Sequence, residues 1–485
     1  MLKENVQMKL SQYRNLYDIL VPKDNLLRKI KENIDFSFVN PMLKEQYCER
    51  FGRPAAEPEM MFKLMFLKKL YDLSDEQLVQ NAYVNIAYKY FLDLDPEDGI
   101  IDSSLMTKFR KTRITQDVLE EMLKETIRQA IDKGIIKSNA IIIDSTHTSA
   151  AARPKSVPQV LRELSKQLRK EIYKSMYDLS EKFPEKPDIT AELGEELEYT
   201  YKLLECTGKE ISECENQKIK KIYHRIKSLL DTDRIREIRS RNDEDARFGH
   251  KTSASTFYGY KNHIAMTEER IITGVEVTSG EASDGKQLET LVEKSKKNGI
   301  NVKEVIGDMA YVSKENLEYC GDNIELIAKS NPVITGLIKN RNDGFEFNKD
   351  AGMMQCPAGE LAMRVDKTEL ESGNTFYRYA FSKKKCKNCP WKESCPAVHK
   401  SENTYSVTVL NERNRARLDF ESTEEFNQRL GIRYRIEEKN GELKQAHGLR
   451  KADSMGLDAM RIQMFFTAFT VNVKRIVKLT ERKAA

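Results

Sequence analysis

Residues 140–149 read AIIIDSTHTS, and this stretch decides the fold. It begins with one alanine and three isoleucines and then reaches Asp144. A compact run of β-branched residues is typical of a strand buried in the centre of a sheet. We therefore predict that the Asp144 carboxylate emerges at the end of a buried strand.

A second aspartate has the same setting further along the chain. Asp308 ends the segment VKEVIGD, residues 302–308. Two such strands side by side would bring both carboxylates together, and like charges that close are unfavourable unless a cation bridges them. From these two runs alone, the ordinary interpretation is that each aspartate simply forms a turn at a strand end.

The chain between the two aspartates changes character several times. Residues 155–240 carry apolar residues at steps of three and four, which predicts a long charged helical hairpin. Strand patterns follow in Phe257–Met266 and Arg270–Val277, with a turn at Glu268-Glu269, and then a helix over Gly285–Lys297. The order strand, helical insertion, two strands, helix, strand is the outline of a mixed sheet with helices packed on it.

Helical patterns dominate both ends of the chain. Pro58–Tyr71 is strongly apolar, a capping box opens at Ser74, and a helix over Gln116–Lys133 stops at Gly134. Helices resume from Glu421. The predicted segments are an all-helical N-terminal domain over 1–135, a first core strand over 136–154, a helical insertion over 155–240, core strands and a helix over 241–330, an irregular β-rich insertion with cysteines over 331–410, and C-terminal core helices over 411–485.

A third acid lies in the segment RYRIEEKNGELKQAHG, residues 433–448. Arg433 lies four residues before Glu437, and Lys444 lies seven after it, so on a helix the three share one face. A carboxylate flanked by two cations suits a site that handles metals and phosphate. The alternative is an exposed helix with ordinary ion pairs. Glu438 is a rival for the third acid, but it turns about 100° away from the face of Arg433.

Together these motifs resemble the DDE transposases of bacterial insertion sequences, in the branch with the spacing Arg-x3-Glu-x6-Lys around the last acid. Asp144 in IIIDSTHTSA resembles the first acid of that family, and Asp308 in EVIGDMAYVS resembles the second. Residues 243–265, residues 278–288 and the N-terminal motifs RFGRPAAEPEMMFKL and SSLMTKFRKT extend the resemblance from about residue 20 to residue 478. The sequence departs from many relatives at Leu430 and at Glu438-Lys439-Asn440, where they have Tyr and Pro-Val-Phe.

This resemblance implies an α/β fold with a ribonuclease H-like mixed-sheet catalytic core. It also implies that Asp144, Asp308 and Glu437 hold two Mg²⁺ or Mn²⁺ ions for strand cleavage and strand transfer. Arg433 and Lys444 would contact the DNA backbone as phosphate anchors. The expected partners are the terminal inverted repeats of the element, its target DNA and a second copy of the chain in a homodimer.

Further DNA contacts are expected from two basic segments. The N-terminal run contains Lys108, Arg110, Lys111 and Arg113, and the alternative for these helices is a structural or dimerising bundle. His250 and Lys251 lie in what we predict to be a polar, basic loop before the second strand.

Two further histidines and the helical insertion have less direct roles. His147 is expected to be structural or close to DNA rather than a ligand, and His263 to pack within its strand. The mixture of charges in the helical insertion favours a solvated, protein-facing role.

Four cysteines in the β-rich insertion form a second candidate metal site. Cys386 and Cys389 have metal-knuckle spacing, and Cys356 and Cys395 complete a set of four thiolates for a structural Zn²⁺. His399 is a competing ligand, and reduced thiols without metal are the alternative. Four lysines and Trp391 near this cluster form either a DNA-facing patch or a solvated basic loop; the lysines are Lys383, Lys384, Lys385 and Lys387.

The overall composition limits the classes of protein that fit. The chain has 485 residues, 39% hydrophobic and 32% charged, with a net charge of +5, so a polyanionic partner requires basic residues to gather locally. No stretch approaches the roughly 18 apolar residues of a membrane span, and no signal peptide is visible, which predicts a cytoplasmic, nucleoid-associated protein. The rival functions are an inactive, transposase-derived DNA-binding protein and a ribonuclease H-like nuclease that cuts fixed DNA structures.

Overall fold

A computed structural model describes residues 11–48, 55–232, 234–252, 255–330, 344–348, 353–370, 373–389, 391–398 and 403–484. The chain divides into two compact units. One contains residues 1–139, 143–301 and 435–485, and the other contains residues 140–142 and 302–434.

The central element is a six-stranded mixed sheet. Its strand order is β2-β3-β1-β5-β6, with β4 pairing with β3. The bounds of these strands are β1 Ala140–Ser149, β2 Arg247–Thr252, β3 Ser255–Thr267, β4 Ile272–Ser279, β5 Glu304–Ile306 and β6 Glu325–Ile327. The mixed α/β architecture with a ribonuclease H-like core is therefore confirmed.

Strand β1 is longer than its apolar run. The isoleucines at 141–143 are fully buried, and the strand continues through Asp144 to Ser149. β1 pairs in parallel with β5 from Ala140↔Glu304 to Ile142↔Ile306, and β5 pairs in parallel with β6. The polar half of β1 also forms a backbone hydrogen bond with the C-terminal segment, because Ser149 N–H donates to the Arg450 carbonyl at 3.0 Å. This bond helps to keep the end of the strand extended.

Strand β2 corrects one expectation from the sequence. The segment with His250 and Lys251 is not a loop but an edge strand that pairs antiparallel with β3, with a shift of register between His250 and Thr252. Its polar sequence shows no apolar alternation, because neither of these two side chains is buried. Gly249 lets β2 approach the backbone just after β4, since a Cβ there would lie 2.1 Å from the Gly280 carbonyl oxygen.

Helices precede and follow the strands of this sheet along the chain. The N-terminal helices are α1 Leu16–Leu20, α2 Leu26–Asn33, α3 Val39–Leu43, α4 Pro58–Leu70, α5 Asp75–Val84, α6 Ile86–Phe91, α7 Ser104–Arg113 and α8 Gln116–Asp132. The other helices outside the insertions are α12 Leu288–Lys297, α13 Lys314–Cys320, α16 Glu412–Glu421, α17 Glu424–Gly431, α18 Tyr434–Ala446 and α19 Leu457–Ala484. The C-terminal helices thus begin at Glu412, before the predicted Glu421.

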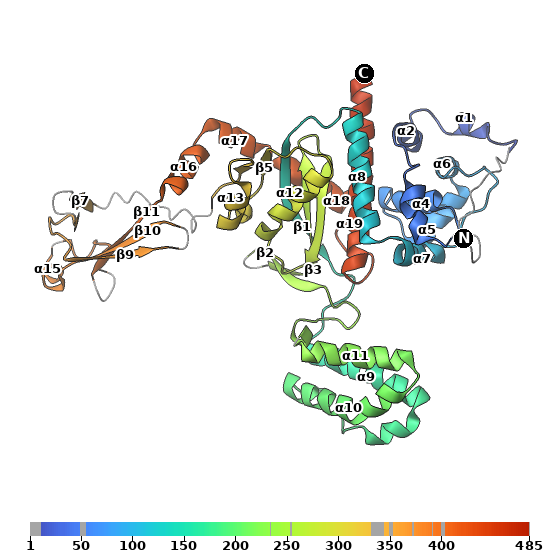
Figure 1. Cartoon of the computed structure of the whole chain (residues 1–485), viewed down its shortest axis with the longest axis horizontal. Coiled ribbons are helices and arrows are strands. Elements are labelled where there is room, and N and C mark those ends of the chain that lie inside the picture. The colour runs from blue at the N-terminus through green and yellow to red at the C-terminus, as the bar shows by residue number, and fades with distance from the viewer. Residues whose placement is uncertain are drawn as a thin grey trace. The chain divides into compact units, whose positions relative to one another are not determined.

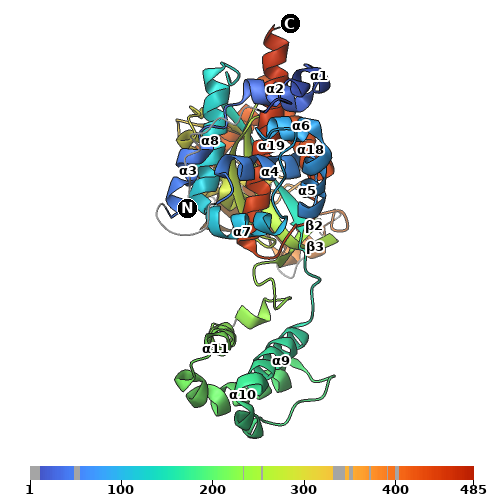
Figure 2. The same cartoon turned by 90° about the vertical axis from the view of Figure 1, so that its right-hand side faces the viewer.

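The long helix α19 packs against the N-terminal helices α4 and α8, and Figures 1 and 2 show it running beside α8. Phe466 and Phe469 are fully buried in an aromatic cluster with Phe36, Phe62 and Phe66. Within the described residues, no helix has the length and apolar character needed to cross a bilayer. The apolar side chains of residues 465–473 are buried in the protein core.

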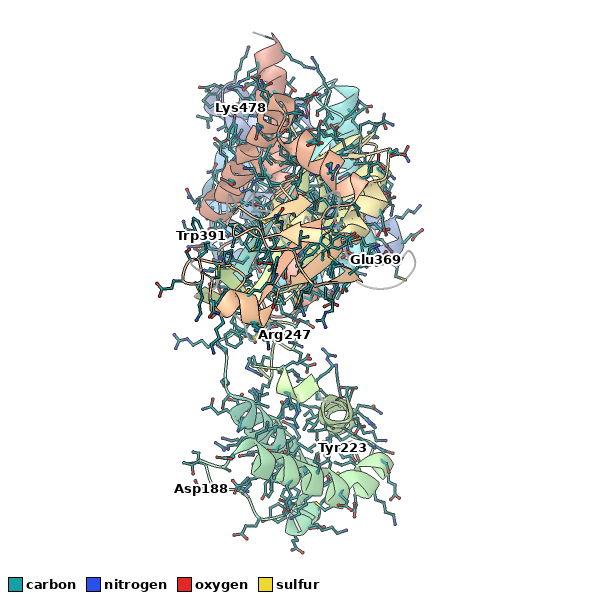
Figure 3. All side chains as sticks on the ribbon, turned by 90° about the vertical axis from the view of Figure 1, so that its left-hand side faces the viewer. Asp188, Tyr223, Arg247, Glu369, Trp391 and Lys478 are labelled. Atoms are coloured by element: carbon teal, nitrogen blue, oxygen red, sulfur yellow. The ribbon has the colours of Figure 1, made fainter. Side chains whose placement is uncertain are left out.

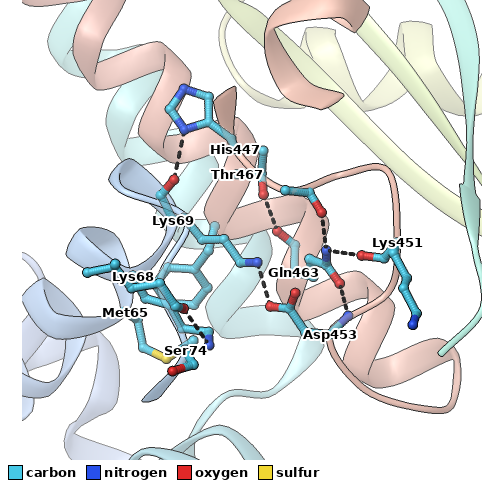
Figure 4. A network of polar contacts seen from close by, with 12 residues as sticks. Met65, Lys68, Lys69, Ser74, His447, Lys451, Asp453, Gln463 and Thr467 are labelled. Atoms are coloured by element: carbon cyan, nitrogen blue, oxygen red, sulfur yellow. Dashed lines mark hydrogen bonds and ion pairs between the residues drawn. The ribbon is translucent and has the colours of Figure 1, made fainter. Parts of the chain in front are cut away.

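Polar contacts reinforce the same junction between α4 and the C-terminal segment (Figure 4). The buried Lys69 ammonium pairs with Asp453 at 2.5 Å, and the Lys69 carbonyl accepts a hydrogen bond from His447 Nδ1 at 2.8 Å. The Gln463 amide bonds to Asp453 N–H and to the Lys451 carbonyl. A buried charge requires such partners, so these contacts favour one docking arrangement of the N-terminal helices.

The helical insertion contains three helices rather than the predicted hairpin. They are α9 Val157–Ser175, α10 Leu193–Glu213 and α11 Gln217–Asp231, and they surround a hydrophobic core of their own (Figure 2). Asn216 caps the start of α11, because its side chain accepts hydrogen bonds from Lys218 N–H and Ile219 N–H. Such a cap allows the chain to reverse between α10 and α11 without a proline.

The β-rich insertion contains small antiparallel sheets. β10 (Thr375–Ala380) pairs with β9 (Arg364–Glu369) and β11 (Thr404–Val409), and β7 (Glu346–Asn348) pairs with β8 (Met353–Gln355). A short helix, α15 (Lys383–Lys387), carries the predicted lysine run. Figure 3 labels Trp391 beyond this helix, where its side chain is 56% exposed.

Candidate active site

The Asp144 carboxylate has a hydrogen-bond partner on helix α18. Asn440 Nδ2 donates to Asp144 Oδ2 at 3.0 Å. The other amide atom, Asn440 Oδ1, is buried and has no hydrogen-bond partner among the described residues. An unsatisfied buried amide oxygen beside a carboxylate is costly unless a cation or an ordered water completes the site.

Helix α18 presents several polar groups on the face that carries Asn440. Glu437 lies three residues before Asn440 and Lys444 lies four after it, which places the three on one helical face. Glu438 points elsewhere, because it pairs with Arg270 at 2.7 Å. Arg433 lies in the turn just before α18, rather than on the helix as the spacing predicted.

Asn440 is a site residue that the sequence analysis missed. It occupies a position that relatives often fill with an apolar residue, so it was treated only as a departure from the family pattern. Its spacing of three residues from Glu437 was the available signal, because that spacing puts both residues on one helical face.

Two lysines lie close to this carboxylate. Burial lowers the pKa of Lys444, nearby Lys251 lowers it further, and Asp144 acts in the opposite direction. Lys251 extends from β2 and is exposed. Two cations that repel each other in this way form a favourable environment for an anion such as a phosphate.

His147, on β1, is uncharged at neutral pH. Burial, together with the nearby charges of Lys444 and Lys251, lowers its pKa to about 4. Its ring packs against Phe257, with the ring centroids 4.9 Å apart. His263 packs within β3 and bonds to Thr278 through Nε2 at 2.9 Å, so the expectation of a packed histidine is met.

Asp308 follows β5 in the second compact unit. Its side chain caps a short 3₁₀ turn at Met309–Tyr311 by accepting a hydrogen bond from Ala310 N–H at 2.9 Å. Tyr311 is fully buried beneath this turn. The turn therefore fixes the backbone at Asp308, and the two residues before it are held in the sheet through β5.

No group of three or more His, Cys, Asp or Glu side chains is arranged to hold a metal ion in the part of the chain that the structure describes. The donor chemistry around Asp144 nevertheless fits Mg²⁺ or Mn²⁺. Carboxylate and amide oxygens are the hard ligands that these ions prefer, and the unsatisfied Asn440 Oδ1 is one such oxygen.

Three segments of the chain match models of known protein families. Residues 15–112 match a transposase domain, and residues 209–346 and 355–477 each match a transposase DDE domain. The chain belongs to the DDE transposases of insertion-sequence type. Members of this family act on DNA and typically use divalent metals.

One curated relative of this chain is an uncharacterized protein, ORF8 in the nfe locus of Rhizobium meliloti. It is 32% identical over 108 residues, which is 22% of this chain and 51% of the relative. The chain thus spans about half the length of that relative. No solved structure matches the chain significantly.

The basic run on α7 contains two kinds of residue, those with contacts inside the protein and those that are exposed. Arg110 pairs with Asp75, and its NH1 donates to Asp75 Oδ1 at 2.9 Å. Arg113 donates to the Gln46 carbonyl and lies over the Tyr47 ring, 4.4 Å from its centroid. These arginines therefore have structural contacts, whereas Lys108 and Lys111 are exposed.

The four candidate zinc cysteines lie near one another, but no three of them form a group arranged to hold a metal ion in the part of the chain that the structure describes. Burial raises the pKa of the Cys386 thiol, and Cys395, Cys356 and Cys389 raise it further. Three of the four, Cys356, Cys386 and Cys389, line a cavity of about 110 Å³. All four are free thiols. The competing ligand His399 lies outside the described residues.

Proposed function

We propose that this chain is an active DNA transposase that cleaves and joins strands at the ends of an insertion sequence, with Asp144, Asp308 and Glu437 as its metal-holding acids. The observation that carries the proposal is the hydrogen bond from Asn440 to Asp144. It joins the strand that bears the first acid to the helix that bears the third acid.

The strand register supports a role for Asp308 in the same reaction. The last pair of β1 with β5 is Ile142↔Ile306, and Asp144 and Asp308 each lie two residues further along. The carboxyl ends of parallel strands meet at the same edge of a sheet. We propose on this basis that the two aspartates act together.

The ion pair of Glu438 supports Glu437 as the third acid. Glu438 is engaged with Arg270 and is therefore directed away from Asp144. Two bound divalent ions would activate the attacking water or 3′-hydroxyl and stabilise the leaving oxygen. Asn440 would orient the Asp144 carboxylate, because it holds one of its two oxygens.

The cationic side chains suggest how DNA is held at this site. Lys444 and Lys251 would anchor phosphates beside the acids, with Arg433 and His250 as further contacts. The exposed Lys108 and Lys111 would contact the terminal inverted repeat. Because transposition holds two DNA ends together, we also propose a homodimer that associates with the nucleoid.

We further propose that Cys356, Cys386, Cys389 and Cys395 bind a structural Zn²⁺. Burial, and after it the three neighbouring thiols, raise the pKa of Cys386, and a bound zinc ion would oppose this by stabilising the thiolates. Among its described residues the insertion has a small hydrophobic core of six buried residues, so a metal would contribute much of its stability.

A cleavage assay tests the proposed function. The purified chain should cut and join labelled DNA carrying the element's ends when Mg²⁺ or Mn²⁺ is added. Asp144→Ala, Asp308→Ala and Glu437→Ala should each abolish cleavage and leave folding and DNA binding intact. Binding without cleavage by the unaltered chain would favour an inactive DNA-binding derivative, and cutting of junctions without any need for the terminal repeats would favour a structure-specific nuclease.

A further inference from the structure

The helical insertion contains a basic pocket that is separate from the acids. It has a volume of about 660 Å³ and is formed by α9, by α10 and by the segment between them. Six of its lining side chains are cationic, namely Arg162, Lys166, Arg169, Lys170, Lys174 and Lys186, and its single carboxylate is Glu196. Glu196 pairs with Arg162 at 2.6 Å, so most of the positive charge has no acid opposite it in the pocket.

Arg169 is the residue that indicates a ligand. It is only 8% exposed, and its Nε and NH1 atoms have no hydrogen-bond partner among the described residues. Its guanidinium carbon lies 5.5 Å from the centroid of the Tyr199 ring, which holds the side chain in position. A buried guanidinium with unused donors requires an anion with several acceptor oxygens.

Helix α9 separates its charges between two faces. Lys166, Arg169, Lys170 and Lys174 recur at steps of three and four and line the pocket. Glu171 of α9 does not line the pocket. It pairs with Lys174 at 2.9 Å and with Lys218 at 3.0 Å, so Lys174 is the member of this row whose charge is partly neutralised. The mixture of charges in the insertion predicted a protein-facing role. In the structure one face of α9 is nevertheless strongly basic.

We propose that this basic pocket binds the phosphodiester backbone of double-stranded DNA and forms a second DNA contact of the proposed transposase. The length of the cationic row favours a polymer over a single phosphate. From Lys166 to Lys174 the helix rises by roughly 12 Å. That rise corresponds to three or four successive phosphates at roughly 3.4 Å per nucleotide of duplex axis.

The test measures DNA binding by the full chain in an Asp144→Ala background, so that no cleavage interferes. The pocket variant is the double substitution Lys166→Gln and Lys170→Gln, both at exposed positions. The matched control is Lys221→Gln with Lys227→Gln on α11, which removes the same charge from exposed positions of the same helical insertion. Arg169→Met is a third variant, and thermal unfolding verifies that each protein folds.

A labelled duplex of mixed sequence is titrated at several salt concentrations. The pocket variant should bind about tenfold or more weakly, and the slope of log affinity against log salt should fall by about two. Arg169→Met should weaken binding in the same direction, and the control pair should change the affinity much less.

Equal affinities and slopes for the pocket and control variants would overturn the proposal. A second result would also overturn it: inorganic phosphate raises the thermal unfolding temperature of the parent but not of Arg169→Met, while DNA binding by Arg169→Met is unchanged. That result would indicate a site for a small anion. Because this assay needs no chemistry, its failure is distinct from a failure of the chain to cleave DNA.

Discussion

The Asn440 amide donates a hydrogen bond to the Asp144 carboxylate at 3.0 Å across 296 positions of sequence. This contact joins the central strand β1 to helix α18. A hydrogen bond to a charged acceptor is shorter and stronger than one between neutral groups. It therefore fixes the orientation of the Asp144 carboxylate, which a metal-dependent reaction requires.

Replacing Asn440 by alanine should slow DNA cleavage. Loss of a hydrogen bond to a charged group costs about 1.5–3 kcal/mol. If that bond is needed in the transition state, the rate falls by roughly ten- to a hundredfold. The expected result is a lower kcat together with a higher Mg²⁺ requirement, measured as cleavage rate against Mg²⁺ concentration.

Gln445→Ala is the control for this substitution, because Gln445 is exposed on the same helix. It should leave both the rate and the Mg²⁺ requirement unchanged. If Asn440→Ala behaved like Gln445→Ala, the contact would have no role in orienting the acid.

The adjacent acids Glu437 and Glu438 should respond differently to the same change. Glu437→Gln should reduce cleavage below detection, because it removes a charge that holds metal. Glu438→Gln breaks only a partly exposed ion pair with Arg270, which should lower the free energy of unfolding by about 0–1 kcal/mol and spare activity. Cleavage assays and denaturant unfolding of the two variants check this, and the reverse pattern would assign the third acid to Glu438.

The free energy of unfolding should decrease as the pH falls below about 6.5, the ordinary pKa of histidine. Burial, with Lys444 and Lys251, lowers the pKa of His147 to about 4, and burial lowers that of His263 to about 4 against the effect of Asp284. The unfolded chain therefore binds protons first as pH falls from about 6.5 to about 4. The free energy of unfolding is at its full value above this window and decreases through it.

Denaturant unfolding at about pH 7 and about pH 5 measures this dependence. His147→Gln and His263→Gln should each reduce the difference between the two conditions. His224→Gln, at an exposed position on α11, is the control and should retain the full difference. An unchanged difference in both buried variants would rule out this origin.

Replacing each of two glycines by alanine should change the stability of the protein in opposite directions. A Cβ at Gly259 would lie 2.0 Å from the Thr148 carbonyl oxygen, so Gly259→Ala should destabilise the protein by about 1–3 kcal/mol or more. At Gly441, inside α18, no described atom lies within 4 Å of the added carbon. Gly441→Ala should therefore stabilise by about 0.5–1 kcal/mol, because alanine loses less conformational freedom in a helix. Thermal unfolding of both variants would detect this contrast.

The purified protein should contain about one zinc ion per chain if the four cysteines bind zinc. Cys386→Ser and Cys389→Ser should each lose the metal and increase proteolysis of the β-rich insertion. Cys214→Ser, in the helical insertion, should retain it. Metal analysis and limited proteolysis measure these results, and a metal-free parent protein that resists proteolysis would contradict the proposal.

Several elements could be predicted because their signals are local. The β-branched run at 140–143 forms a buried strand, Ser74 forms the expected capping box, and α8 ends where Gly134 adopts a positive φ. Each of these outcomes depends on residues only a few positions apart, and backbone preferences act over that range.

Other features could not be predicted from local patterns. The segment with His250 looks like a loop, yet it forms β2 because β3 offers it backbone partners. The sequence predicts that Arg110 contacts DNA, and in the structure its guanidinium forms an ion pair with Asp75 of a different helix. In both cases a distant partner decided the outcome, and such partners have no fixed spacing in sequence.

The sequence by itself determined the family, the mixed α/β class and the identity of the acids proposed for catalysis. Only the tertiary structure revealed that Asn440 holds Asp144 and that two donor atoms of Arg169 are buried without a partner among the described residues. The physical reason is that a residue type and its spacing specify which chemistry a side chain can perform. Burial and hydrogen bonding between distant segments exist only after the chain has folded, and they decide which side chains act together.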